Sequence, residues 1–194
     1  MKNIIFLFTL VFALAGASVA QAAPVTFSAH LDGPSEASPN ASPGVGDALI
    51  IFDTDLHTLS VNVSFSGLLG QTSVSHINCC TASPGVGNAG VATEVPSFDS
   101  FPVGVSSGSY VHLFDMTQAS SLNPAFVTAS GSLAQAELDL LRGSFAGGAY
   151  LNIHSSLFPA GEIRGFLVPV PEPGGLILLG LGLILVGLCR CRKY

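Results

Sequence analysis

A histidine, a glutamate and an arginine lie close together near the end of a chain in which only 9% of the residues are charged. The stretch reads NIHSSLFPAGEIRG, from Asn152 to Gly165. Side chains two positions apart share one face of a strand, so Asn152 and His154 point to the same side. Glu162 and Arg164 share a face of the next strand in the same way, and SSLFPAG forms a hairpin loop between the two strands. We therefore expect a polar cluster of His154, Glu162 and Arg164 that fixes the register of a sheet.

Two adjacent cysteines, Cys79 and Cys80, are a second candidate for chemistry. Adjacent cysteines can close a strained ring, pair between molecules or stay unpaired, and the geometry of a disulfide makes the ring uncommon. The export signals described below place these thiols on the oxidising side of the membrane. We predict an oxidised pair in a loop, because one adjacent pair does not make a disulfide framework.

The sequence offers little to support catalysis. Ser155 and Ser156 follow His154, but neighbours on a strand point to opposite faces and Ser156 belongs to the expected loop. Neither serine is therefore aimed to act as a nucleophile with His154 as its base. No pair of carboxylates stands out from the general acidity. We expect a protein that is not an enzyme and needs no cofactor.

Seven segments alternate apolar and polar residues with the period of a half-buried strand. In TLSVNVSFSG the residues Leu59, Val61, Val63 and Phe65 share one face. The other six segments are Val25–Leu31, Asp47–Asp53, Thr72–Asn78, Ser109–Met116, Gly148–His154 and Glu162–Val168. Turn clusters rich in Gly, Pro, Ser and Asp separate them, which is typical of an antiparallel β-sandwich or barrel.

One segment, SLAQAELDLLRG, breaks the strand series. Ser132 and Gln135 have the spacing of a capping box, and Gly143 stands where a helix would end. We expect one short helix over about residues 134–142, packed across one end of the sheets. The turn SPGVGDA (42–48) recurs as SPGVGNA (83–89), which predicts two similar Pro-Gly turns, the second a candidate cover for a ligand site.

Both ends of the chain carry targeting signals. Lys2, an apolar run from Ile4 to Ala15 and the small residues around Ala22 predict a signal peptide over residues 1–22. At the other end, an apolar run over residues 174–189 precedes a basic end, 190–194, and predicts a stop-transfer helix with the basic end in the cytoplasm. The segment between them is thus expected outside the cytoplasm.

The composition limits the class of partner. Six Lys and Arg residues stand against twelve Asp and Glu, and half of those basic residues lie in the last five positions. The domain between the signals therefore cannot neutralise phosphates, which excludes nucleic acid as a partner. Its length suits one hydrophobic core.

The C-terminal tail resembles the PEP-CTERM protein-sorting tail. Pro171, Glu172 and Pro173 form the motif, and a short Gly/Leu helix and an Arg-rich end follow, so the tail covers residues 169–194. The resemblance implies a Gram-negative host, often with exopolysaccharide gene clusters, and removal of the tail by an exosortase. The alternative is a permanent single-span anchor. The two differ physically, because cleavage leaves no membrane span.

The domain, residues 23–168, resembles the CHRD module. The resemblance rests on VTFSAHLDGPSEASPNASPGVGDALIIFD, VSHINCCTASPGVGNAGVAT, SGSYVHLFDM and AYLNIHSSLFPAGEIRGFL. It implies an antiparallel immunoglobulin-like β-sandwich without an established activity. It also implies a family-motif polar cluster of His76, Asn152, His154, Glu162 and Arg164.

A metal site is the competing hypothesis. In the CHRD family the stretch at His76 usually reads H-I-H, whereas Asn78 occupies the second histidine position here. His76 and His154, with Cys79 or Cys80, could still bind copper or zinc. The first expectation remains a binding or structural module at the cell surface or in an exopolysaccharide matrix. Its processing partners would be signal peptidase and an exosortase-type enzyme.

Overall fold

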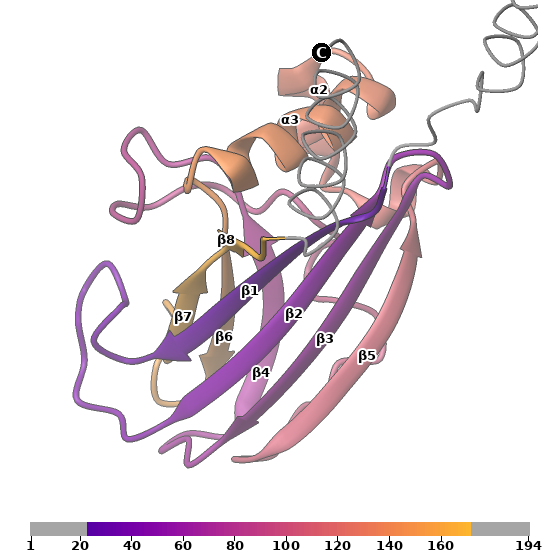
Figure 1. Cartoon of the computed structure of the whole chain (residues 1–194). Coiled ribbons are helices and arrows are strands. Elements are labelled where there is room, and N and C mark those ends of the chain that lie inside the picture. The colour runs from indigo at the N-terminus through magenta and orange to yellow at the C-terminus, as the bar shows by residue number, and fades with distance from the viewer. Residues whose placement is uncertain (1–22, 172–194) are drawn as a thin grey trace, which may run out of the picture.

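The computed structural model describes residues 23–171, in which eight strands form one antiparallel sheet (Figure 1). The spatial order is β4-β6-β7-β1-β2-β3-β5, and β8 also pairs with β1. The strands are β1 (Val25–Asp32), β2 (Val45–Asp53), β3 (Thr58–Ser66), β4 (Thr72–Asn78), β5 (Gly108–Asp115), β6 (Tyr150–Ser155), β7 (Ile163–Phe166) and β8 (Val168–Pro169). The predicted all-β antiparallel class is confirmed. The seventh predicted strand is divided into β7 and β8.

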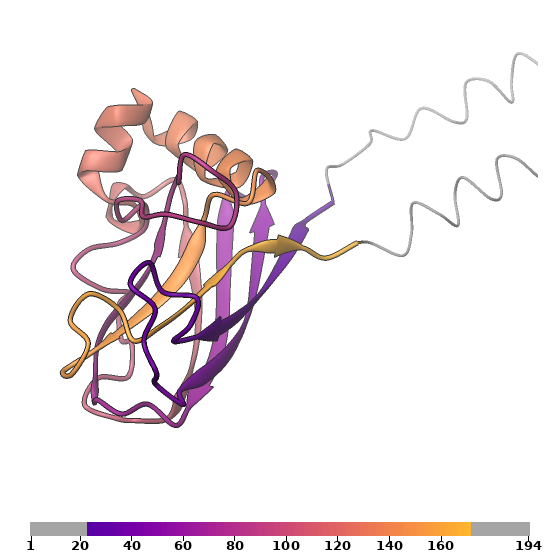
Figure 2. The ribbon, with the colours of Figure 1, turned by 90° about the vertical axis from the view of Figure 1, so that its left-hand side faces the viewer.

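The sheet curls back on itself, so that β4, β6 and β7 lie behind β1, β2 and β3 (Figures 1 and 2). We expected an antiparallel immunoglobulin-like β-sandwich, and the two facing layers fit a sandwich-like fold. The two layers belong to one sheet, because β7 pairs with β6 on one side and with β1 on the other. Asp32 of β1 lies opposite Arg164 of β7, and this pairing joins the two layers into one continuous sheet.

The core lies between the two layers of the curled sheet. The alternation predicted for β3 is confirmed, since Leu59, Val61, Val63 and Phe65 are each at most 4% exposed. The other layer contributes fully buried side chains from β4, β6 and β7, which are Ile77, Leu151, Ile153 and Ile163. The period of two in β3 arises because this strand has one buried and one solvated face.

Two α-helices, α2 (Pro124–Ser130) and α3 (Leu133–Phe145), cover one end of the sheet (Figure 1), and a 3-10 turn, η1 (Ala119–Ser121), precedes them. We expected a single helix, and the prediction missed α2. Its start carries a clear signal, because Asn123 caps the helix by accepting from the Ala125 N–H and Pro124 follows. The predicted cap of α3 is confirmed, since the Ser132 hydroxyl accepts from the Gln135 N–H.

Gly143 does not end α3 as predicted but lies inside it and is buried. A Cβ at this position would collide with the sulfur atoms of Cys79 and Cys80. The glycine is therefore explained by the close approach of the helix to the cysteine pair, and the helix continues to Phe145.

The two predicted targeting signals fall mostly outside the described residues. The signal peptide (1–22) and the apolar run (174–189) both lie there, and Pro171 is the one described residue of the sorting motif. Within residues 23–171 no helix is long and apolar enough to cross a membrane.

Candidate functional site

A row of polar side chains crosses β4, β6 and β7 on the face that points away from the core. His76 lies opposite Asn152, and Asn152 lies opposite Arg164. All three are buried, with 6%, 4% and 3% of their surface exposed. Buried polar groups are costly unless they are paired, so the neighbours of this row define what it can do.

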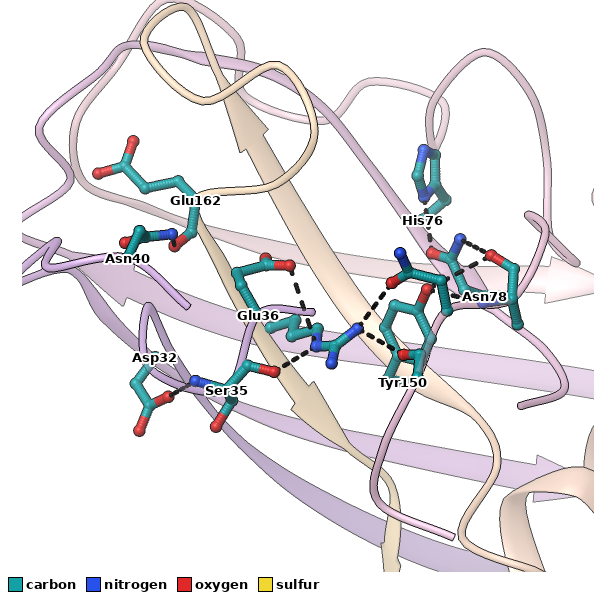
Figure 3. A network of polar contacts seen from close by, with 12 residues as sticks. Asp32, Ser35, Glu36, Asn40, His76, Asn78, Tyr150 and Glu162 are labelled. Carbon is teal, nitrogen blue, oxygen red and sulfur yellow. Dashed lines mark hydrogen bonds and ion pairs between the residues drawn. The ribbon is translucent and has the colours of Figure 1, made fainter. Parts of the chain in front are cut away.

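Arg164 is held by two loops that close over the row. Its Nε donates to the carbonyl of Ser35, and its Nη1 donates to the carbonyl of Gly87 at 2.9 Å and to Oδ1 of Asn88 at 3.1 Å. Figure 3 shows Ser35 and Glu36 beside the guanidinium that both contact. The guanidinium also lies over the ring of Tyr150, 4.8 Å from its centroid. Arg164 therefore ties loop 33–44 and loop 81–93 to the sheet.

Glu36 is the carboxylate beside Arg164. Its Oε2 lies 3.9 Å from Nε of Arg164, and only 7% of the residue is exposed. Burial raises the pKa of Glu36 to about 7, although Arg164 and the Ala37 N–H act in the opposite direction. Its Oε1 is buried and has no hydrogen-bond partner within residues 23–171. The side chain is thus poised to gain or lose a proton near neutral pH.

Glu162 does not join the predicted cluster with Arg164. Ser42 donates its hydroxyl to Oε1 of Glu162 at 2.6 Å, and the backbone N–H groups of Leu69 and Gly70 also donate to the carboxylate. Burial acts to raise the pKa of Glu162, but these hydrogen bonds and one from Ser155 outweigh it and hold the pKa below its ordinary value. The separation has a simple cause. Glu162 precedes the first residue of β7, so strand alternation does not apply to it.

His76 and His154 are brought together, as the metal hypothesis required. Their ring centroids lie 4.8 Å apart, although β4 and β6 are far apart in the sequence. Burial, together with the neighbouring His154, lowers the pKa of His76 to about 4. Burial also lowers the pKa of His154. Both rings are therefore neutral at physiological pH.

The cysteines are not available to this pair of histidines as thiolate ligands. Cys79 and Cys80 are joined to each other in a disulfide, and the pair packs on α3 at Gly143. Within residues 23–171 no group of three or more His, Cys, Asp and Glu side chains is arranged to hold a metal ion. The disulfide therefore rules out the predicted set of metal ligands that included Cys79 or Cys80.

Two glycine patterns in the sequence match catalytic motifs in spacing alone. GVGNAG (85–90) has the spacing of a dinucleotide-binding loop, but it forms the loop that closes over Arg164 and opens no helix. GVSSG (104–108) has the spacing of a nucleophile elbow, yet it leads into β5 instead of joining a strand to a helix. Neither pattern has the structural context that its chemistry needs.

Sequence reasoning missed Glu36 and the loop around it. Ser42 of the first SPGVG turn binds Glu162, and Gly87 and Asn88 of the second bind Arg164. The repeated turn was the sequence signal that could have pointed to these loops. One copy binds Glu162 and the other binds Arg164, the two charged residues of the GEIRG stretch.

This architecture belongs to a known family. A family model for the CHRD domain matches residues 27–167, which is most of the chain, and the protein is therefore a member of the CHRD family. A second model, for the PEP-CTERM protein-sorting motif, matches residues 169–193. No curated protein and no solved structure significantly matches the chain. The motif identifies the chain as a substrate of an exosortase-type sorting system, exported and anchored before cleavage.

Proposed function

We propose that this protein is a binding or structural module of the cell surface or extracellular matrix of a Gram-negative bacterium, with no reaction of its own. The observation that carries the proposal is the order of its parts, a CHRD domain followed directly by a sorting motif. A sorting tail delivers a folded domain to the envelope, and the domain then acts there. Removal of the tail would release it from the membrane.

The outer face of β2, β3 and β5 supports a binding role. Val111 and Leu113 of β5 are 71% and 63% exposed, and Leu49 of β2 is 41% exposed. Asn62 of β3 lies between Leu49 and Val111 in the register, so the apolar side chains alternate with uncharged polar ones. The middle of this face is uncharged, and Asp47, Asp53 and Asp115 lie toward its ends. Such a surface suits non-covalent contact with a neutral polymer or another surface protein, which makes exopolysaccharide a proposed partner.

The sorting half of the proposal is tested in the host. The full chain is expressed in strains with and without the exosortase-type enzyme, and membrane, surface and medium fractions are compared by mass spectrometry. We expect a shortened chain at the surface or in the medium when the enzyme is present, and an intact membrane-bound chain when it is absent. An intact chain in both strains would refute processing and favour a permanent anchor.

The binding half is tested on the exposed face. The double substitution Val111→Ser and Leu113→Ser removes the most exposed apolar side chains of β5, and Leu56→Ser serves as a matched control because Leu56 is 67% exposed outside the strands. We expect the double variant alone to lose retention in the matrix fraction. Equal retention of both variants would exclude this face as the binding surface.

A further inference from the structure

The hydrogen bonds of His154 determine which of its nitrogens is free. Nδ1 lies 2.9 Å from the carbonyl oxygen of Pro159. A carbonyl can only accept, so Nδ1 carries the proton and Nε2 carries a lone pair. That Nε2 is buried and has no hydrogen-bond partner among the described residues. Burial of a lone pair without a partner is unfavourable unless it accepts a hydrogen bond or binds a cation.

His76 has the same tautomer for a related reason. Its Nδ1 lies 3.2 Å from Oδ1 of Asn78. The orientation of the Asn78 amide is set by its other end, since Nδ2 donates to the carbonyl of Ala89 at 3.0 Å. Oδ1 is therefore an acceptor, Nδ1 of His76 carries the proton, and Nε2 carries the lone pair. A histidine whose Nδ1–H is fixed by an oxygen is the usual arrangement of a metal ligand.

A buried amide lies on the same face of the sheet as the two histidines. Asn152 lies directly opposite His76 and two residues from His154 on the same face of β6. It is 4% exposed, and its Oδ1 is another buried acceptor that has no partner in the described part of the chain. The imidazole and amide acceptors therefore share one patch of the buried face.

The backbone makes room for these acceptors at Gly161. A Cβ at this residue would lie 2.7 Å from the Asn152 amide and 2.5 Å from Oε1 of Glu36, which is also buried and unpaired among the described residues. Gly161 also has a φ of 130°, which favours glycine. The loop that carries Pro159 and Gly161 thus packs around buried acceptor atoms, which a hydrogen-bond donor or a cation would stabilise.

We propose that His76 Nε2, His154 Nε2 and Asn152 Oδ1 form a site for one divalent copper- or zinc-type ion. Imidazole nitrogens favour such ions, and Cu²⁺ binds most tightly among the first-row divalent metals. Asn78 and the Pro159 carbonyl orient the two rings, and water completes the coordination. Glu36 lies beside Asn152 as a neighbouring charge and is not a ligand. The site goes beyond the surface-module function and does not depend on it.

The experiment uses the full chain, purified in detergent without chelators and titrated with Cu²⁺ alone. We expect one ion per chain by calorimetry and an electron paramagnetic resonance signal with coupling to two nitrogens. His76→Ala and His154→Ala are each expected to weaken binding at least about tenfold, the lower end of what loss of even an orienting partner costs. His30→Ala is the matched control, because His30 is exposed and pairs with Asp47, and its affinity should equal that of the wild type.

Two outcomes would overturn the proposal. Equal Cu²⁺ affinity in the wild type and both histidine variants would show that binding occurs elsewhere. Absence of a two-nitrogen signal in the wild type would show that the two histidines do not bind Cu²⁺ together, and this result requires no variant to fold. Circular dichroism of each variant establishes its fold before titration. Failure of the metal site would leave the fractionation result of the sorting experiment unchanged, so the two proposals fail separately.

Discussion

Replacement of Glu36 by glutamine should change how the stability of this protein depends on pH. Glu36 is buried beside Arg164, and burial raises its pKa from an ordinary value of 4.5 to about 7. Glutamine has nearly the same shape and stays neutral at every pH. The variant therefore imitates the protonated form of Glu36 throughout the titration.

The pKa shift sets both the magnitude and the direction of the effect. The folded state binds the Glu36 proton more tightly than the unfolded state, so its contribution is fully present below pH 4.5 and is lost as the pH rises through 7. A shift of two to three units corresponds to about 3 kcal/mol, because each unit is worth about 1.4 kcal/mol. Glu36→Gln should match the wild type near pH 4.5. At pH 8 it should be more stable by up to about 3 kcal/mol.

Urea unfolding at a series of pH values between 4.5 and 8.5, with a chelator present, measures this difference. All other titrating groups are common to both proteins, so they cancel when the two unfolding free energies are subtracted. Arg164→Lys is a useful second variant, since it keeps the charge beside Glu36 but loses the forked hydrogen bonds to Gly87 and Asn88. A difference between Glu36→Gln and the wild type that is constant with pH would refute the reasoning.

Four further predictions follow from other contacts. Gly143→Ala should destabilise the fold by about 1–3 kcal/mol in urea unfolding, because its Cβ would overlap the cysteine sulfurs, whereas Gly90→Ala, with open space around it, should have little effect. Glu162→Gln should cost about 2–3 kcal/mol in the same assay, because it weakens charge-assisted hydrogen bonds from Ser42 and two backbone N–H groups; the control Glu94→Gln loses one exposed contact and should cost less. Acidification below pH 6.5 should destabilise the wild type through His76, whose pKa is lowered to about 4, and His76→Gln should reduce that loss; parallel unfolding curves would contradict this. Alkylation of the exported chain without reductant should leave Cys79 and Cys80 unmodified in the mass spectrum, and two labelled thiols would contradict the disulfide.

The strand pattern was predictable where a strand has one buried and one solvated face. The alternation in β3 placed Leu59, Val61, Val63 and Phe65 on the core side, and the structure agrees. The predicted bounds of β4, Thr72–Asn78, are those of the structure. The signal is weaker in β6, where residues 150–153 are all buried, because loops cover the polar face as well.

The partners of the buried polar groups could not be read from the sequence. Glu162 and Arg164 have the spacing of a pair on one strand, yet Glu162 binds Ser42 and Arg164 binds Gly87 and Asn88. Those contacts join residues far apart in the chain, and the register of β6 against β7 and the path of two loops decide them. Glu36 carried no local signal, since its pKa is raised only when the folding of loop 33–44 buries its side chain.

The sequence by itself determined the class of this protein, its sorting tail and the residues that carry the family motif, because these depend on local pattern and order along the chain. Only the tertiary structure decided that the two layers are joined in one curled sheet, and that His76 lies next to His154 with their ring centroids 4.8 Å apart. The physical reason is that strand pairing and burial are long-range. They bring distant residues together and remove water from them, and this sets both the hydrogen-bond partners and the pKa of each buried group.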